Sequence, residues 1–475
     1  MNSPACTRIT TAGLLLVATV LGCSRTVNPD IERGSTYFFM EGHPEIRLSA
    51  IGYLDEEDNG VIDISADIVH ASLIYRESEG QNTANIEVEI RVTSSDGRNF
   101  SRNWRDEMEI LREETGIITT QDIKKFEHQF NVPPGAYDIA VAIQDLSSDK
   151  RTTRTAETYI PDPEDNDVNL TTIRLLGKDM SLPEPDYQPI TTYDVPAVND
   201  SIRFLIQVTN NRIEEPLEVA SRLIHYESDN EPARSMSMNN YGASSMAYRG
   251  IDYNRVEEID ATRRVLDQSG SVMIEYRFPR PDYGNYRFEV RAVTPDDEEL
   301  YRGRDFGVKS ENYPAIKSPR ELAEPLFYLM TPKEYESMLE IEDPDSLKAE
   351  VDRFWLSNIG SANRARHVIS LYYQRIEEAN KQFSSYKEGW KTDQGMIYIL
   401  FGPPWYIDQR LNEMQWSYAY DRTDPRYNFY FMRPKLRNEF FPFEHYLLLR
   451  DYSYYNLQYH QVQLWLTGQI LQANM

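Results

Sequence analysis

The chain has 475 residues and carries a net charge of −26, with 76 acidic residues against 50 basic ones. This acidity argues against nucleic acid, and against an anionic membrane surface, as an electrostatic partner. The length suits about three domains, and a hydrophobic share of 40% allows each of them a core.

The N-terminus has the pattern of an exported protein. Arg8 precedes an apolar run over residues 12–21, which is too short to span a bilayer, since spanning takes about 20 residues. Residues 1–22 are therefore predicted to be a signal peptide. The sequence Val20-Leu21-Gly22-Cys23 resembles a bacterial lipobox, which implies that Cys23 is acylated and anchors the protein to a membrane. An ordinary signal peptide followed by an incidental cysteine is the alternative. Cys6 would leave with the signal, so no disulfide is expected.

Residues 23–35 are polar and unpatterned, and we expect them to form a tether. Over residues 36–160 apolar side chains alternate with period two, which predicts a β-sandwich domain. A turn and a strong strand at residues 133–142 recur at residues 281–292, so a second sandwich is predicted at 199–312. Both are expected to be immunoglobulin-like, joined by a proline-rich connection at 161–198, with a strand over residues 168–176 as the alternative within it. In each repeat a tyrosine, Tyr137 or Tyr286, follows the turn glycine and is expected to act as a tyrosine corner.

After Tyr313 the apolar period becomes helical. A capping box at Thr331-Pro332-Lys333-Glu334, a helix start at Asp343-Pro344 and a stripe over residues 368–383 predict three helices. Residues 396–401, 415–420 and 428–432 are predicted strands. Residues 316–475 therefore predict an α+β domain with helices first and a small antiparallel sheet after them.

The sequence Gly389-Trp390-Lys391-Thr392-Asp393, followed by Gly395 and a Gly402-Pro403-Pro404 turn, resembles the GWxTD domain family of bacterial envelope proteins. Trp416 and Tyr418 resemble the Trp-x-Tyr that follows in this family, and the similarity covers roughly residues 319–432. The resemblance implies an envelope protein and brings no established catalytic activity.

Each motif residue also has a folding reason. We expect Gly389 to permit a positive φ at a helix end, and Trp390 to enter the core with its N–H on a carbonyl. Thr392 and Asp393 would hold a tight turn, and Gly395 would release the chain into a strand. A binding site on this loop is the alternative.

One segment has the acid spacing of a calcium loop, with candidate ligands Asp55, Glu57, Asn59 and Asp63. Ala66 stands where the bidentate Glu of such a loop belongs, and a β-turn explains the segment equally well. The seven histidines show no zinc-ligand spacing. We therefore expect no cofactor and no metal.

Three hypotheses about function remain. The first is a non-enzymatic, lipid-anchored protein of the cell envelope, at the outer membrane, with a structural or protein-docking role and other envelope proteins as partners. The second is a glycan-binding module, in which exposed aromatic side chains stack on sugar rings: Trp405, Tyr406, Trp416, Tyr418, Tyr427 and Tyr430. The third is a hydrolase with a site near Asp393 and Glu413.

Overall fold

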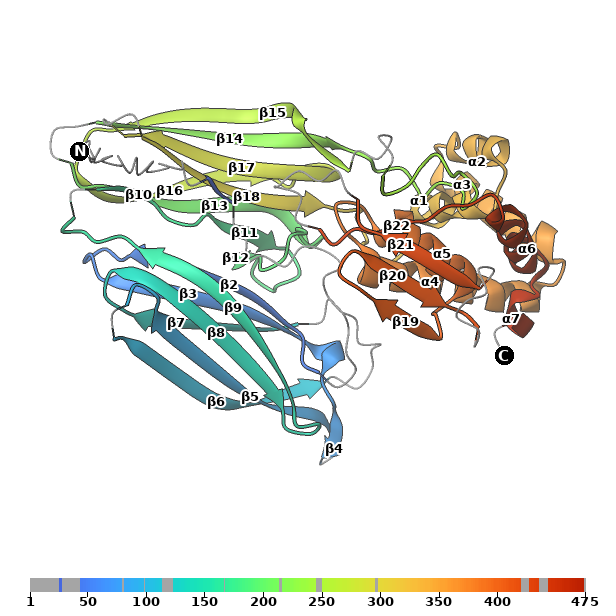
Figure 1. The fold of residues 1–475 in the computed structure, drawn as a ribbon, viewed down its shortest axis with the longest axis horizontal. Coiled ribbons are helices and arrows are strands. Elements are labelled where there is room, and N and C mark those ends of the chain that lie inside the picture. Colours follow the sequence, from blue (N-terminus) through green and yellow to red (C-terminus); the bar gives the residue numbers. More distant parts are fainter. Residues whose placement is uncertain are drawn as a thin grey trace, which may run out of the picture.

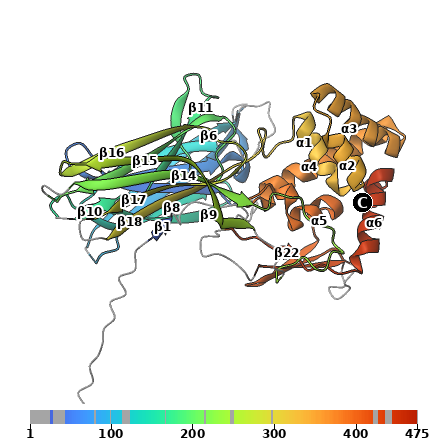
Figure 2. The ribbon, with the colours of Figure 1, turned by 90° about the horizontal axis from the view of Figure 1, so that it is seen from above.

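The structure is a computed structural model of the whole chain, in which two β-sandwiches and a C-terminal domain are visible (Figure 1). The first sandwich lies alongside the second, and the C-terminal domain lies at one end of both (Figures 1 and 2). The residues described below are 25–27, 43–78, 81–97, 99–112, 123–165, 167–212, 216–244, 250–294, 298–419, 427–434 and 443–473. Cys23 and the predicted signal peptide at 1–22 lie outside this part of the chain.

The first sandwich packs a three-stranded sheet, in the order β2-β3-β7, against a sheet in the order β4-β5-β8-β9, with β6 also paired to β5. Alternate apolar side chains of both sheets form one buried core, for example Ile62 and Ile64 from one sheet and Val88 and Val141 from the other. The elements are β2 (Ile46–Leu54), β3 (Gly60–Val69), the 3-10 turn η2 (His70–Ser72), β4 (Arg76–Ser78), β5 (Gln81–Ser94), β6 (Ser101–Arg112), β7 (Ile123–Asn131), β8 (Gly135–Asp145) and β9 (Lys150–Ile160).

The second sandwich packs a sheet in the order β1-β18-β17-β14-β15 against a sheet built around β13, which pairs with β10, β11 and β16. Phe204 and Phe288 stack between the two sheets with ring centroids 4.3 Å apart. The strands are β1 (Arg25–Val27), β10 (Val168–Leu170), β11 (Arg174–Asp179), β12 (Asp186–Pro189), β13 (Asn199–Asn210), β14 (Leu217–Ser228), β15 (Ile251–Leu266), β16 (Gly270–Pro279), β17 (Gly284–Val293) and β18 (Glu299–Val308).

Two segments predicted as connections contribute strands to this second sandwich. The connection at 161–198 supplies β10, β11 and β12, which pair with β13 or with one another. Within the predicted tether at 23–35, β1 runs parallel to β18 at the sheet edge. The prolines of residues 161–198 therefore lie at or near the ends of short strands, and this segment is not a free linker.

Both predicted tyrosine corners are present. The Tyr137 hydroxyl donates to the Pro133 carbonyl at 2.6 Å, and the Tyr286 hydroxyl donates to the Asp282 carbonyl at 2.9 Å. Each bond spans four residues and closes the turn before β8 or β17. The sequence repeat is thus a repeat of the same local structure.

Polar contacts join the two sandwiches. The Gln207 side chain donates to the Leu54 carbonyl at 2.7 Å and accepts from the Leu54 N–H at 2.8 Å. The buried Asp63 carboxylate accepts from the Arg174 guanidinium at 2.9 Å. The Gln207 amide thus uses both its donor and its acceptor across the boundary, and Asp63 Oδ2 adds an ion pair, so these contacts fix the geometry of the boundary.

The C-terminal domain has helices first, then a four-stranded antiparallel sheet in the order β19-β20-β21-β22, and two more helices after it. A single core of aromatic and aliphatic side chains joins both parts, with Trp355, Trp390, Trp416 and Trp465 all buried in it. The elements are α1 (Pro319–Ala323), η3 (Glu324–Tyr328), α2 (Pro332–Leu339), α3 (Pro344–Ile359), α4 (Ala362–Phe383), η4 (Gly389–Lys391), α5 (Asp393–Phe401), β19 (Tyr406–Gln409), β20 (Glu413–Ser417), β21 (Asn428–Met432), β22 (Leu447–Leu448), α6 (Tyr454–Thr467) and α7 (Ile470–Ala473).

The prediction of a strand at residues 396–401 is wrong, because this segment is the helix α5. The run is apolar on every side and buried except for half-buried Phe401, so its periodicity does not separate a helix from a strand. The N-cap decides: Thr392 has extended backbone dihedrals, and its hydroxyl accepts the Gly395 N–H at 3.0 Å. Gly402, at φ 86°, ends the helix.

Candidate functional site

The GWxTD sequence lies in a buried loop, residues 384–393, between α4 and α5. Every residue of this loop is buried except Lys391, which is partly exposed. The loop contacts α4 on one side and the end of the second sandwich on another. Its residues are therefore placed to join elements rather than to face solvent.

The two glycines of the motif allow close packing of three chain segments. A Cβ on Gly389 would lie 1.9 Å from the Ala379 carbonyl oxygen, and a Cβ on Gly395 would lie 1.9 Å from the Gly389 carbonyl oxygen. The expected positive φ at Gly389 is not found, since Gly389 is absent from the positive-φ glycines of the described chain. Close approach of backbones, and not backbone handedness, requires glycine at both positions.

Trp390 is buried in the domain core, with 2% of its surface exposed. Its indole N–H donates to the Glu388 carboxylate at 2.9 Å, where a carbonyl was expected. Its backbone N–H donates to the Asn380 side chain at 3.1 Å, and its carbonyl accepts the Tyr328 hydroxyl at 2.7 Å. All its polar groups are thus used inside the protein, and its ring is not available to a ligand.

Thr392 caps α5 and closes the motif. Its hydroxyl donates to the Gly389 carbonyl at 2.7 Å while it accepts the Gly395 N–H. One side chain thereby fixes both motif glycines, which explains a threonine at this position.

Asp393 forms a fully buried, bidentate ion pair with Arg450. Arg450 Nη2 lies 2.6 Å from Asp393 Oδ1, and Arg450 Nη1 lies 2.7 Å from Asp393 Oδ2, which also accepts the Leu448 N–H at 2.7 Å. Burial raises the pKa of the Asp393 carboxyl, but the Arg450 charge and these donors outweigh it and hold the pKa below its ordinary value. Asp393 is therefore a structural group whose ionised form is favoured by Arg450 and the Leu448 N–H.

Arg450 extends this pair to the second sandwich. Its guanidinium donates to the carbonyls of Arg234 and Ser235, both at 3.1 Å, in the segment that follows β14. The Tyr328 hydroxyl accepts the Ala233 N–H at 3.2 Å in the same segment. Asp393, Arg450 and Trp390, through Tyr328, thus hold residues 233–235 against the C-terminal domain. We call this set of contacts the motif joint.

Charged side chains of the loop make a second connection to the same sandwich. The Lys387 ammonium donates to the Glu231 carbonyl at 2.8 Å, and burial lowers the pKa of Lys387 to about 8. Glu388 accepts the Ser310 N–H at 3.1 Å just after β18. Lys309 donates to the Ser385 carbonyl at 2.8 Å. The loop is thus bound to the segment that follows β14 and to the segment that follows β18.

Residues 291–467 match the profile of the GWxTD domain family. The chain contains a GWxTD domain. The match begins within β17, so it includes the end of β17, all of β18 and the GWxTD side of the motif joint, but not residues 233–235. No curated protein matches the sequence.

Solved structures with partial similarity include red sea bream transglutaminase, at 10% identity and a TM-score of 0.17, and E. coli alpha-2-macroglobulin, at 16% identity and a TM-score of 0.18. The first match covers 56% of this chain and 31% of that chain, and the second covers 57% and 16%. The chain thus spans less than a third of either protein, and at these values neither similarity says anything about activity. No enzyme family is indicated.

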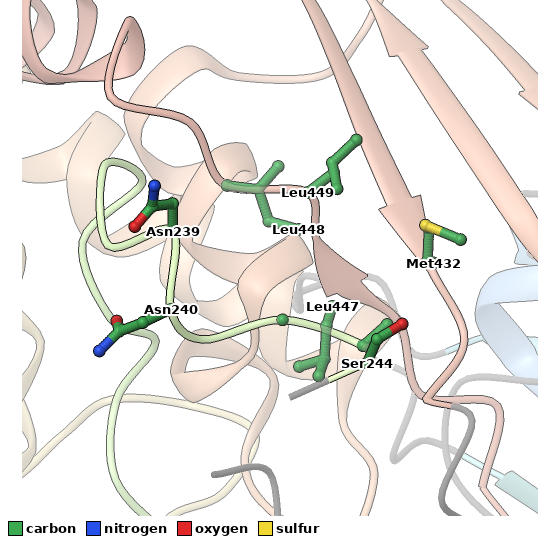
Figure 3. A pocket seen from close by; sticks show the side chains of 9 residues that line it. Asn239, Asn240, Ser244, Met432, Leu447, Leu448 and Leu449 are labelled. Carbon is green, nitrogen blue, oxygen red and sulfur yellow. The ribbon is translucent and has the colours of Figure 1, made fainter. Parts of the chain in front are cut away.

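A groove of about 330 Å³ lies beside the motif joint of the GWxTD domain (Figure 3). Leu448, whose N–H binds Asp393, forms part of its wall. One side is the segment after β14 and the other is the sheet edge at β22; the lining residues are Asn239, Asn240, Gly242, Ala243, Ser244, Met432, Leu447, Leu448 and Leu449. The lining contains no Asp, Glu, His, Lys or Arg, so the groove offers apolar contact and amide hydrogen bonds.

The aromatic residues proposed to stack on sugars do not form one exposed face. Trp416 is buried at 1% exposure, and the Tyr418 hydroxyl donates to the Gly402 carbonyl at 2.8 Å. Trp405 and Tyr406 are exposed, at 66% and 43%. Trp405 lies at a bend before β19, and Tyr406 is the first residue of that strand. The structure therefore separates the residues that the sequence grouped.

The calcium candidates are not brought together either. Asp55 accepts the backbone N–H groups of Glu57 and Asn59 in the β2–β3 hairpin, while Asp63 lies in β3 and pairs with Arg174. In the described ranges no three His, Cys, Asp or Glu side chains gather closely enough to hold a metal ion. The hairpin is a local turn built on Asp55.

The proposed acidic pair of a hydrolase is also divided between two roles. Asp393 is buried against Arg450, whereas Glu413 is exposed on β20 and pairs with Arg410 at 3.0 Å. The pKa of the Asp393 carboxyl is held below its ordinary value, whereas a general acid at neutral pH needs a raised one.

Sequence reasoning missed Arg450 and Lys387, which complete the motif loop. Arg450 follows the apolar run Leu447-Leu448-Leu449, and a lone cation that ends such a run was the available signal.

Across the described helices, none is long and apolar enough to cross a bilayer.

Proposed function

We propose that this chain is a lipid-anchored protein of the bacterial cell envelope with a non-enzymatic, structural role. Residues 1–22 would be removed and Cys23 acylated, with the outer membrane as the destination. The two sandwiches, which the paired tyrosine corners favour as immunoglobulin-like, would carry the GWxTD domain away from the membrane.

One observation supports the structural role. The Trp, Thr and Asp side chains of the GWxTD motif all bond to other parts of this chain. Trp390, Thr392 and Asp393 are buried with internal partners, and Asp393 reaches the second sandwich through Arg450. A catalytic or binding motif would leave at least one such group facing a cavity or solvent. The motif would therefore hold the GWxTD domain at a fixed angle to the second sandwich.

The anchor is tested by metabolic labelling with a clickable fatty acid in the native host. Cys23→Ser should lose the label and leave the membrane fraction. Cys6→Ser is the matched control, because it removes the other cysteine and leaves the lipobox intact; it should label like wild type. A Cys23→Ser protein that keeps its label would contradict the anchor.

We further propose that other envelope proteins dock on the GWxTD domain. Light cross-linking in living cells, followed by purification and mass spectrometry, would compare wild type with Leu449→Arg, which alters an exposed residue of the groove. Leu411→Arg changes a more exposed leucine outside the groove lining and is the control. Loss of the same stoichiometric partners in Leu449→Arg alone would support docking at the groove. Recovery of no envelope protein with wild type would refute the docking role and favour glycan binding, with Trp405 as the first residue to test.

A further inference from the structure

The strand β15 is an outer strand of the second sandwich. It spans 16 residues and, among the described residues, pairs on one side only, with β14. Residues 254–261 are all exposed, including the apolar Val256 and Ile259, and Val265 is exposed at 64%. A long outer strand with exposed apolar side chains is a template for pairing with another strand.

A β-bulge divides the strand into two halves. Leu223 lies opposite Asp260 and Ile224 lies opposite Glu258, so Ile259 has no counterpart on β14. Because β14 itself is regular, the faces of β15 exchange at the bulge. Val256 and Glu258 lie across from Tyr226 and Ile224, on the outer face of the sheet.

After the bulge the outer face carries residues of odd number. Ala261, Arg263 and Val265 lie across from Arg222, Ala220 and Glu218, which share the outer face with Ile224. The opposite face of β15 carries Glu257 in its first half and Asp260, Thr262 and Arg264 in its second half.

We propose that a second copy of this chain pairs with β15 in antiparallel fashion, about a two-fold axis at Ala261. In this register Ala261 lies opposite its own copy and Asp260 lies opposite Thr262. Past the bulge, Glu258 meets Arg263, Glu257 meets Arg264 and Val256 meets Val265. Each pair joins side chains of the same face, as antiparallel pairing requires.

The charge pattern favours a second copy over another partner. Between residues 255 and 266 the strand has three arginines and three acidic residues, 3 − 3 = 0, in a chain whose net charge is −26. Two-fold symmetry makes each Glu–Arg pair occur twice. Moving the axis to residue 260 sets Asp260 against itself, and moving it to residue 262 sets Glu258 against Val265. Main-chain bonds would supply attraction, while the charges would set the register.

A cysteine on the axis tests the register. Cα atoms of directly opposed antiparallel residues lie about 4.5–5.5 Å apart, within disulfide range. Ala261→Cys in the full chain should therefore give a covalent dimer in cells after mild oxidation, on a non-reducing gel. Wild type, which has the same Cys6 and Cys23, is the first control. Val265→Cys is the second, because its two copies would lie roughly 27 Å apart at about 3.4 Å per residue.

Cross-linking of Ala261→Cys alone supports the proposal, and its absence, or equal cross-linking of Val265→Cys, overturns it. Charge reversal gives an independent check in the Ala261→Cys background. Glu257→Arg and Arg264→Glu should each lower the dimer yield about fivefold, since like charges would then face each other twice. The double reversal should restore the yield, whereas a variant damaged in folding would not recover. Failure of the double reversal to restore the yield would contradict the proposed register.

Discussion

Replacing Asp393 by alanine should destabilise the GWxTD domain by about 4 kcal/mol. The change leaves the Arg450 guanidinium buried without its counter-ion, which costs about 3–5 kcal/mol in comparable sites. It also removes the acceptor of the Leu448 N–H, although this cost overlaps with the first and is not added in full. Arg450→Met should destabilise the domain by about 3 kcal/mol, because it leaves the buried carboxylate without a cation.

Urea unfolding followed by tryptophan fluorescence measures this effect in the right domain. Five of the six tryptophans lie after residue 316, and Trp104 is the exception. The double variant Asp393→Ala/Arg450→Met should be less destabilised than the sum of the single variants by about 2 kcal/mol, because it leaves no unpaired charge.

The exposed pair Arg410–Glu413 provides the control. Glu413→Ala breaks an ion pair at 3.0 Å between two exposed side chains, so it should change the unfolding free energy by less than about 0.5 kcal/mol. If Asp393→Ala unfolds at the same urea concentration as Glu413→Ala, the buried pair does not stabilise the domain and the reasoning fails.

Three further outcomes follow from the same contacts. Trp390→Ala should cost about 3–5 kcal/mol as a core truncation, and a melting curve equal to wild type would show that Trp390 does not hold the core. Gly395→Ala should lower the unfolding free energy by about 3 kcal/mol or more, since its Cβ would meet the Gly389 carbonyl. Gly242→Ala should be neutral, because no described atom lies within 4 Å of the added Cβ. Equal melting temperatures of the two variants would refute the close-packing argument. Burial lowers the pKa of His445 from an ordinary 6.5 to about 3. Below pH 6.5 the unfolded chain therefore binds a proton that the folded chain does not, and the stability of the folded state falls as pH falls. Between about pH 7.5 and pH 5 wild type should lose about 2 kcal/mol more than His445→Gln, with exposed His460→Gln as the control; parallel pH curves for wild type and His445→Gln would contradict this.

Local sequence signals predicted the parts of the fold that depend on local contacts. The tyrosine corners each span four residues, and the capping box at Thr331 spans three, so each could be read directly from a short string. The repeated turn-and-strand pattern likewise placed β8 and β17.

Contacts between distant residues account for most of what the sequence did not show. Asp393 and Arg450 are 57 residues apart, and Arg450 contacts a carbonyl 215 residues away. No pattern within one element encodes such a pairing. The helix α5 was missed for another reason: an all-apolar run has no face, so only the Thr392 cap distinguished it from a buried strand.

The candidate site shows the same division. The motif residues were identified from the sequence, and their burial matches the folding reasons given for Trp390 and Thr392. Their joint purpose was not visible, because it depends on residues 231–235, which belong to a different domain. Exposure alone separated Trp405 from Trp416, and exposure is a property of the folded chain.

We infer that the GWxTD motif holds the C-terminal domain to the second sandwich. Hydrogen–deuterium exchange of the full chain tests this role, with Ala233 and Met236 as probes, since their N–H groups bond to Tyr328 and Gln458 of the GWxTD domain. Asp393→Ala should speed exchange in this segment while exchange in the first sandwich stays unchanged. Unchanged exchange at residues 233–236 in a variant whose GWxTD domain is otherwise loosened would show that the motif stabilises only its own domain.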